Sequence, residues 1–416
     1  MSLFFFCFIE KTKNDKYLKK CMVGSHKRSI FALKNQLYRI MKNKNLHIKL
    51  LSYALLTVIG FSTIALSSCG DKEEEDLPFD QMVLNVATTL LEVGPQTEMY
   101  SVEVESNMSV AVASNDQWLR AEVSGDNKKI KLYVPALPND VCMRVAEVRI
   151  RIGVNNWQKE RTLKVKQVSD SHVFSVSGNG MSAQFRMQRV SGGRFWMGNN
   201  SGYEWEGPVH EVTLTKGYYI CDREVTQALW YAIMGRNPTS DYSKQWSESL
   251  GLGDEYPAYY VSYDDCKDFI TALNAKLSDQ LPEGVSFRLP TEAEWEFAAK
   301  GGLQTHGYMF AGSDSINDVG WYRDNSNFDI HKVALKAPNE LGLYDMTGNL
   351  EEWCSDVYDN YSSYEQTDPT GPNSGYRRVV RGGNYCLNPN QCTNTYRNTD
   401  SYLTREHFNG MRLALD

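Results

Sequence analysis

The C-terminal half of the chain contains the stretch Phe287-Arg-Leu-Pro-Thr-Glu-Ala-Glu-Trp-Glu-Phe-Ala-Ala299. Pro290 is expected to end a short strand, and Thr291 follows it in a position to cap a helix. Because Glu294 stands three residues after Thr291, the pair has the spacing of a capping box. Paired glutamates in a first helical turn complement the helix dipole, which favours a structural role for them. The helix is predicted to bury one apolar stripe, formed by Ala293, Phe297 and Ala298.

Further phrases of glycine, aromatic and polar residues lie on both sides of this stretch. Two precede it, Gly192-Gly-Arg-Phe-Trp-Met-Gly198 and Tyr218-Tyr-Ile-Cys-Asp-Arg-Glu-Val-Thr226. An amphipathic helix is expected to follow residues 256–263 and to end near Leu277. Three more phrases close the chain: Leu341-Gly-Leu-Tyr-Asp-Met-Thr-Gly-Asn-Leu-Glu-Glu-Trp353, Arg378-Val-Val-Arg-Gly-Gly-Asn-Tyr-Cys-Leu-Asn-Pro-Asn-Gln-Cys392 and Gly410-Met-Arg-Leu-Ala-Leu415.

In this order the phrases resemble the sulfatase-modifying-factor family, whose enzymes convert a sulfatase cysteine to formylglycine. The resemblance covers residues 183–416, which we assign to one domain. It implies the α+β fold of the formylglycine-generating enzyme, a fold related to C-type lectins that has few regular elements and long loops. The glycine-, asparagine- and aspartate-rich stretch 312–339 fits such a fold.

The family's enzymes hold Cu(I) between two cysteine thiolates and use it with O₂, and soft thiolates suit that ion. Counted from the double glycine at 382–383, Cys392 stands where the second of these cysteines belongs. Leu387 stands at the place of the first, and Cys386 comes one residue early. Cys386 and Cys392 are therefore the catalytic pair only if a bulged loop brings them together. Two interpretations of Cys386 and Cys392 therefore stay open. They hold copper together, or they form a disulfide bond with each other.

Two other positions of the family's reaction site also differ here. Asn384 replaces a serine, and Glu351 replaces the tryptophan that precedes Glu-Trp in the family. Productive geometry in an active site is held within about 0.5 Å, so these departures favour binding over catalysis.

The resemblance also implies a calcium loop. Two carboxylates and two backbone carbonyls form a hard oxygen cage that suits Ca²⁺. The alternative interpretation is that the two carboxylates only cap turns. The implied ligands are Asp345, Gly348, Leu350 and Glu352.

The segment 384–402 is rich in asparagine, threonine and tyrosine. Small amides combined with aromatic anchors are typical of antibody binding surfaces, and in lectin-like relatives the same stretch is the ligand-binding face. The alternative is a polar loop whose asparagines form turns. The candidate ligand-binding residues are Asn384, Tyr385, Asn388, Asn390, Asn394, Tyr396, Arg397 and Tyr402.

Residues 81–169 have the pattern of a second domain. Polar and apolar residues alternate at 101–105, 130–134, 145–152 and 162–166. Such alternation places one face of a strand in a core, and several such strands predict an immunoglobulin-like β-sandwich. With Arg144 and the closing residues 165–167, the segment resembles BACON domains of gut-bacterial lipoproteins. No cluster of surface aromatics is evident in it, so we predict a spacer, joined to the next domain by a linker at 170–182.

A targeting segment precedes the two domains. A basic stretch begins at Met41, residues 50–66 are nearly all apolar, and Leu66-Ser-Ser-Cys69 has the form of a lipobox. The pattern predicts a lipoprotein signal at 41–68 and a lipid on the thiol of Cys69. The alternative is one transmembrane helix, for which the apolar run is short. Residues 1–40 precede a complete signal, so we expect translation to start at Met41.

The acidic stretch 69–80 resembles a surface-export tether, so the expected location is the outer membrane, facing outward. The net charge of −7 argues against a nucleic-acid partner. We therefore predict a surface lipoprotein whose C-terminal domain binds a glycan or protein ligand. The alternatives are a formylglycine-generating oxidase acting on a sulfatase cysteine, and a structural subunit of an envelope, secretion or gliding complex.

Overall fold

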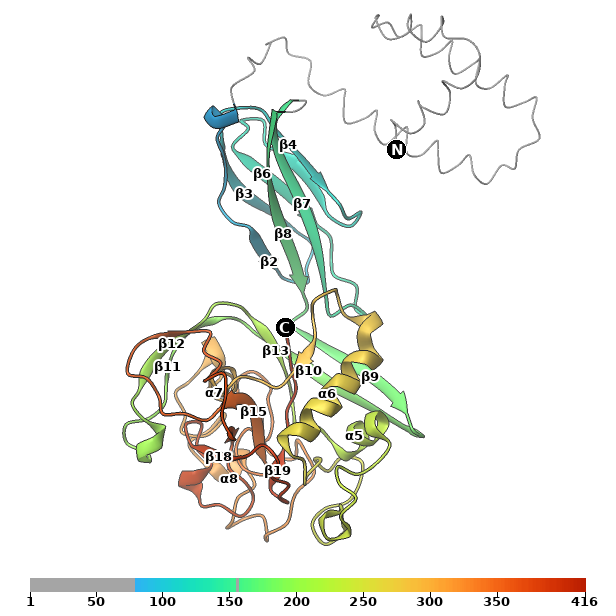
Figure 1. Ribbon diagram of the computed structural model, residues 1–416, viewed down its shortest axis with the longest axis vertical. Helices are drawn as coiled ribbons and strands as arrows, with labels where there is room; N and C mark the ends of the chain where they lie inside the picture. The colour runs from blue at the N-terminus through green and yellow to red at the C-terminus, as the bar shows by residue number, and fades with distance from the viewer. Residues whose placement is uncertain (1–78, 155–156) are drawn as a thin grey trace, which may run out of the picture. The chain divides into compact units, whose positions relative to one another are not determined.

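The computed structural model describes residues 79–154 and 157–416 (Figure 1). The N-terminal 40 residues, the predicted signal peptide, Cys69 and most of the tether lie outside these residues. None of the helices in the described part of the chain has the length and apolar character that crossing a membrane requires.

Residues 84–168 form two four-stranded sheets, with strand orders β1-β3-β6-β5 and β2-β8-β7-β4. The alternating stretches of the sequence lie in strands, as predicted, and alternate side chains of β3 and β6 are buried. Val102 and Ile130 of one sheet share a hydrophobic cluster with Ile150 and Val165 of the other. The immunoglobulin-like class and the BACON resemblance stay predictions. After the turn η2 (Phe79–Gln81), the strands are β1 (Leu84–Val86), β2 (Leu90–Val93), β3 (Glu98–Ser106), β4 (Val110–Ser114), β5 (Arg120–Val123), β6 (Lys129–Val134), β7 (Met143–Val154) and β8 (Trp157–Val168).

The predicted linker at 170–182 is wrong, because this stretch belongs to a β-hairpin. Strand β9 (Ser171–Gly178) pairs antiparallel with β10 (Met181–Val190) from Ser171 to Gly178. Phe174 is buried, and its ring stacks on that of Phe185 with the ring centroids 5.4 Å apart. Burial of these rings fixes the hairpin as the edge of the C-terminal domain's largest sheet.

That sheet has five strands in the order β14-β20-β13-β10-β9. One helix packs against β9 and β10, and a second packs against the first and against β14 (Figure 1). Trp230 of the first stacks on Phe269 of the second at 5.1 Å between ring centroids. The helix predicted to end near Leu277 is confirmed. The elements are β13 (Tyr218–Cys221), α5 (Gln227–Met234), α6 (Tyr263–Leu277), β14 (Phe287–Arg288) and β20 (Ala414–Leu415).

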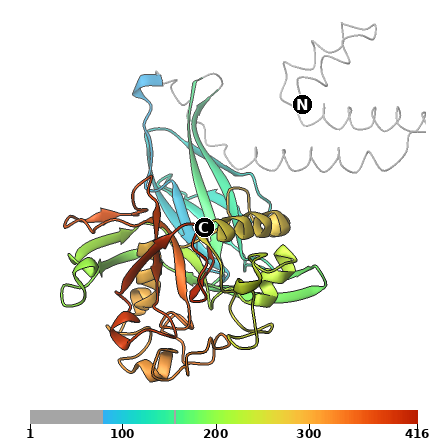
Figure 2. The ribbon, with the colours of Figure 1, turned by 60° about the horizontal axis from the view of Figure 1, so that its bottom comes forward.

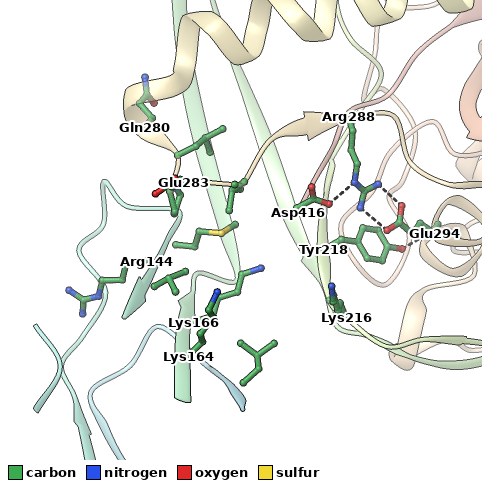
Figure 3. Close-up of a pocket in the computed structure, with 18 of the residues that line it drawn as sticks. Arg144, Lys164, Lys166, Lys216, Tyr218, Gln280, Glu283, Arg288, Glu294 and Asp416 are labelled. Atoms are coloured by element: carbon green, nitrogen blue, oxygen red, sulfur yellow. Dashed lines mark hydrogen bonds and ion pairs between the residues drawn. The ribbon is translucent and has the colours of Figure 1, made fainter. Parts of the chain in front are cut away.

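The helix predicted from the capping box is α7 (Glu292–Ala299), and all of its residues are buried. The Thr291 side chain accepts from the Glu294 backbone N–H at 3.1 Å, and the Glu294 carboxylate accepts from that of Thr291 at 2.9 Å. Figure 3 shows the Arg288 guanidinium between Glu294 and Asp416, with N–O distances of 2.6 and 2.7 Å. These contacts confirm the structural role predicted for Glu294.

Two smaller sheets complete the domain, with strand orders β11-β12-β16 and β18-β17-β15-β19. Long loops join them, and the orange segment in Figure 2 between α7 and β15 has little regular structure. The predicted mixed fold with few regular elements is confirmed. The strands are β11 (Gly193–Met197), β12 (His210–Leu214), β15 (Glu351–Val357), β16 (Gln366–Thr367), β17 (Arg377–Arg381), β18 (Arg397–Ser401) and β19 (Asn409–Gly410). The short helices are η3 (Glu204–Glu206), η4 (Tyr242–Lys244), η5 (Ser278–Gln280), η6 (Gly302–Gln304), α8 (Ile316–Val319) and η7 (Pro389–Gln391).

Candidate ligand-binding site

The sheet β18-β17-β15-β19 brings the C-terminal phrases together. Glu352 of β15 is paired with Arg381 of β17 on one side and with Gly410 of β19 on the other. Arg381 is in turn paired with Arg397 of β18. The loop between β17 and β18, residues 382–396, carries both candidate cysteines and most of the candidate ligand-binding residues. The sheet therefore fixes the two ends of this loop.

A network of charged side chains lies buried between this sheet and α7. Arg381, which is fully buried, donates to Glu292 at 2.9 Å and to Glu296 at 2.6 Å. Arg397 donates to Glu292 at 2.7 Å, and its guanidinium carbon lies 3.7 Å from the ring centroid of Tyr361. Buried charges are tolerated where they are paired and hydrogen-bonded, as these are. The network therefore neutralises itself and joins α7 to β17 and β18.

The candidate calcium ligands lie in the interior beside this sheet. Glu352 accepts from Arg412 at 2.6 Å and from the Trp295 indole at 2.7 Å, so its carboxylate is already engaged. One oxygen of Asp345 accepts from the Ala334 backbone N–H at 2.6 Å. The other, Oδ1, is buried without a hydrogen-bond partner. Gly348 has a φ of 74°, and a Cβ there would lie 2.0 Å from the Trp321 carbonyl oxygen, so this turn requires glycine.

A third carboxylate, which the sequence analysis missed, belongs to the same region. Glu224 accepts from the Leu350 backbone N–H at 3.0 Å and from the Asn349 side chain at 2.7 Å. Burial raises its pKa well above the ordinary range, and the charges of Asp345 and Glu352 add to that. Burial also raises the pKa of Asp345 to about 6. In the described residues no three His, Cys, Asp or Glu side chains are grouped closely enough to hold a metal ion. Asp345 thus fits a cation, whereas Glu352 is committed to Arg412.

The two candidate cysteines lie in different surroundings. Cys392 is fully buried in a hydrophobic cluster with Phe310 and Tyr322, and Leu387 packs against that cluster. Cys386 is half-buried and packs against the separate cluster that contains Tyr385. Both thiols are free in the structure. Leu387 thus belongs to the surroundings of Cys392, and Cys386 does not.

Burial also favours the protonated form of these two thiols in the metal-free protein. Burial raises the pKa of Cys392 to about 12, and the nearby charge of Glu351 adds to the shift. Burial likewise raises the pKa of Cys386. Cu(I) is held by thiolates, and a reactive cysteine needs a deprotonated sulfur. Because Leu387 packs against the Cys392 cluster and Cys386 packs against a different one, the residues present do not fit a two-thiolate copper centre.

Glu351, which stands in the place of the family's tryptophan, is buried as well. It accepts from the Asn398 side chain at 2.9 Å, and burial raises its pKa to about 7. Asn384, which replaces the family's serine, is buried and accepts from the Cys386 backbone N–H at 2.9 Å. A carboxyl group and amides therefore line the region where the family has an aromatic ring and a hydroxyl.

The candidate ligand-binding residues divide into an exposed group and a buried group. Asn388 and Asn390 are exposed and Tyr402 is partly exposed. Tyr385 is buried, with its hydroxyl 2.5 Å from the His407 ring nitrogen Nδ1. Burial commits it to the interior, as the ion-pair network commits Arg397. The remaining buried members are Asn384, Asn394 and Tyr396.

Three loops of the domain, near residues 199–206, 307–314 and 389–395, enclose a cavity of about 810 Å³. Asn390 and Asn394, two of the predicted residues, line it. A second cavity of about 630 Å³ adjoins it and shares Asn199, Gly202 and Tyr203. Trp205 lines this second cavity and is 43% exposed. Volumes of this size are typical of small-molecule sites.

The loop 199–207 was missed by the sequence analysis, although it supplies the aromatic wall of both cavities. Tyr203 and Trp205 stack with ring centroids 4.8 Å apart and an interplanar angle of 10°. The signal that could have found them is the pair of large rings between Gly202 and Gly207, in a polar stretch without strand or helix periodicity. Aromatic residues in such a stretch are not expected to pack in the hydrophobic core, so they are candidates for ligand binding.

These features define a mixed α+β domain of short sheets and long loops, with a recessed site formed by its C-terminal segment. Residues 176–416 match the family model described as "Sulfatase-modifying factor enzyme 1-like domain". The chain belongs to this family.

Its relatives differ in what they are described to be. The formylglycine-generating enzyme of Streptomyces coelicolor is 38% identical, over 50% of this chain and 81% of its own length. The "Chaperone protein LppX" of Paenibacillus barcinonensis is 26% identical, over 56% of this chain and 90% of its own length. The solved structure of Treponema denticola variable protein 1 is 31% identical with a TM-score of 0.51, over 59% of this chain and 98% of its own. Family membership therefore fixes the fold and leaves the choice between enzyme and binding protein to the site.

Proposed function

We propose that the chain is a lipid-anchored bacterial surface protein whose C-terminal domain binds a glycan or protein ligand and does not oxidise a sulfatase cysteine. The observation that carries the proposal is that Leu387 packs against the hydrophobic cluster of the buried Cys392, whereas Cys386 packs against a different cluster. A copper oxidase of this family needs two thiolates facing one metal ion. The cavity beside the same loop supports binding as the retained role.

The N-terminal region is proposed to anchor and extend this domain. The signal at 41–68, the lipid on Cys69 and the acidic tether support a position on the outer membrane surface. The two sheets of residues 84–168 would then be a BACON-type, immunoglobulin-like spacer. The Arg144 guanidinium lies 4.1 Å from the ring centroid of Trp118 and covers a face of that indole. That contact supports a spacer role.

Formylglycine formation provides the direct test. The purified chain, supplied with Cu(I) and O₂, is expected to leave the cysteine of a sulfatase-motif peptide unconverted, because Leu387 supplies no thiolate. Mass spectrometry of the peptide measures the conversion, and the Streptomyces coelicolor enzyme serves as the positive control. Turnover that is lost on Cys392→Ser would reject the proposal and favour the oxidase alternative.

Calcium is proposed to bind at the Asp345 loop. The carboxylates of Asp345, Glu224 and Glu352 lie in one buried region, where Arg412 is the guanidinium that pairs with Glu352. A divalent cation would offset the remaining negative charge and supply a partner for Asp345 Oδ1. The carbonyl oxygens of Gly348 and Leu350 are the other ligands that the family resemblance implies.

Removal of calcium is expected to lower the melting temperature of the purified chain. A ligand at one hundred times its Kd stabilises the native state by about 2.7 kcal/mol, which corresponds to about 5–10 °C for a domain of this size. Scanning calorimetry with EGTA and with added CaCl₂ measures the difference. Asp345→Asn should abolish it, whereas Asp264→Asn, on the exposed face of α6, should leave it unchanged. A wild-type melting curve that is indifferent to EGTA would rule out the calcium site.

A further inference from the structure

We infer that the two adjoining cavities bind a neutral oligosaccharide, with Trp205 as the stacking platform and Asn394 as a buried acceptor. This inference rests on the proposed binding function and adds the location of the site and the class of ligand. The larger cavity holds about 810 Å³ and its neighbour about 630 Å³. Because Asn199, Gly202 and Tyr203 line both cavities, an elongated ligand can occupy the two together.

The walls of this site are pre-formed. The Glu206 carboxylate accepts from the Tyr203 backbone N–H at 3.0 Å and from the Thr395 hydroxyl at 2.7 Å. The Asn390 side chain donates to the Tyr203 hydroxyl at 2.8 Å. Arg397 donates to the Trp205 carbonyl at 3.2 Å, so the buried ion-pair network also fixes the loop. A site that is held in shape before binding loses less entropy when its ligand arrives.

The exposed surface around the cavities is aromatic and apolar. One face of Trp205 packs on Tyr203, and the indole is 43% exposed. Across the larger cavity, Tyr308 is 37% exposed and Met309 is 58% exposed. Flat rings at the edge of a recess provide large contact area at low conformational cost. The apolar face of a sugar ring fits such a surface.

The polar groups available inside the larger cavity are mainly neutral. Asn394 donates its side-chain N–H to the Tyr308 carbonyl at 3.1 Å, while its Oδ1 is buried without a partner. An unpaired buried acceptor costs free energy until a ligand donates a hydrogen bond to it. A sugar hydroxyl is a donor of that kind. The neutral side chains of Asn199 and Thr393 also line the cavity, where they hydrogen-bond to Ser201 and Tyr396.

Three charged side chains line this wall, and one of them, the exposed Asp314, accepts from the Met309 backbone N–H at 2.8 Å. Lys300 is the one cationic residue among the described residues that line the larger cavity, and its Nζ donates to Glu296 at 2.6 Å and to the Trp196 carbonyl at 2.8 Å. The Glu206 carboxylate accepts from Tyr203 of its own loop and from Thr395 of the neighbouring loop. An acidic ligand would find no free cation here, so the site favours an uncharged saccharide over an anionic one.

The test uses the purified chain and hexasaccharides of β-1,4-linked glucose, mannose, xylose and galactose, followed by isothermal titration and tryptophan fluorescence. Binding of at least one of them is expected. Trp205→Ala should weaken it about tenfold or more, since losing a central aromatic contact costs more than about 1 kcal/mol. Asn394→Ala should weaken it as well. The matched control is Trp196→Ala, because Trp196 is 64% exposed on β11 and lines neither cavity.

Three results would overturn the inference: no binding of any neutral hexasaccharide at millimolar concentration, equal binding by Trp205→Ala and the wild type, or preferential binding of a hexagalacturonate. Selection of short peptides from a displayed library without sugar binding would assign the site to a protein ligand. If formylglycine turnover is also absent, that outcome refutes the inference that the site binds an oligosaccharide. The proposed binding function would still stand. Turnover in the peptide assay would refute the function itself, so the two failures are distinguishable.

Discussion

Replacing Arg381 by methionine is expected to lower the free energy of unfolding of the C-terminal domain by about 3–5 kcal/mol, the usual cost of removing one partner from a buried ion pair. Arg381 is fully buried and donates to Glu292, Glu296 and the Asn394 carbonyl, the last at 2.8 Å. Methionine fills similar space and donates nothing. Glu296, also fully buried, would keep only Lys300 and the Gly198 backbone N–H.

The charge state of Glu296 sets the pH at which this effect is largest. Burial raises its pKa, but Lys300 and Arg381 outweigh burial and hold the pKa at about 2, against an ordinary value of 4.5. Because the folded-state pKa is depressed, this contribution to stability is complete above about pH 4.5 and is lost as the pH falls toward 2. Urea unfolding at pH 7, followed by tryptophan fluorescence, is the appropriate measurement.

The matched control is Arg377→Met on the same strand, since Arg377 is exposed. Its effect should stay within about 0.5 kcal/mol. Adding Glu296→Gln to Arg381→Met should recover part of the loss, because the uncompensated buried charge is then removed. A cost below about 1 kcal/mol for Arg381→Met alone would mean that the network contributes little to stability.

The same network explains why the site cannot be separated from the fold. Arg381 holds the Asn394 carbonyl, and Arg397 holds the Trp205 carbonyl at 3.2 Å. Asn394 lines the larger cavity and Trp205 lines the adjoining one, although the two residues are almost 190 positions apart in the sequence. A shift of either strand would therefore move the platform and the buried acceptor relative to each other.

The parts of the fold that depend on local chemistry were predictable from the sequence. The capping box at Thr291 and Glu294 follows from residues three positions apart, so its spacing alone predicts α7. Strand β9 was not recognised, because its identity depends on pairing with β10 and on burial of Phe174 against Phe185. The sequence predicts a linker there because the stretch falls between two stronger patterns.

The sequence predicts the residue types of the candidate site, but it does not predict which of their side chains point into the protein interior. The segment 384–402, which is rich in asparagine and tyrosine, lies beside a cavity that Asn390 and Asn394 line. Nothing in that composition says that Arg397 turns inward, since its partner Glu292 lies over one hundred residues earlier. The platform of Tyr203 and Trp205 was missed for the same reason, because only the folded chain brings it to the C-terminal segment.

Replacing Cys69 by alanine is expected to abolish incorporation of radiolabelled palmitate and to move the protein from the membrane fraction to the soluble fraction. The prediction follows from the sequence Leu66-Ser-Ser-Cys69 after an apolar run, which would place the lipid on this thiol. Acyl chains contribute about 0.8 kcal/mol per buried CH₂, and stable anchoring needs more than one chain. Without the acceptor thiol no chain is attached, so the loss of retention should be nearly complete.

Cys21→Ala provides the control, because residue 21 precedes the predicted start at Met41 and should not be present in the mature protein. Labelling and membrane retention should equal those of the wild type. Protease added to intact cells then tests the outward orientation, since a surface-displayed chain is digested and one facing the periplasm is protected. Membrane retention of the unlabelled Cys69→Ala protein would instead favour the transmembrane-helix alternative, because an apolar span holds the chain without a lipid.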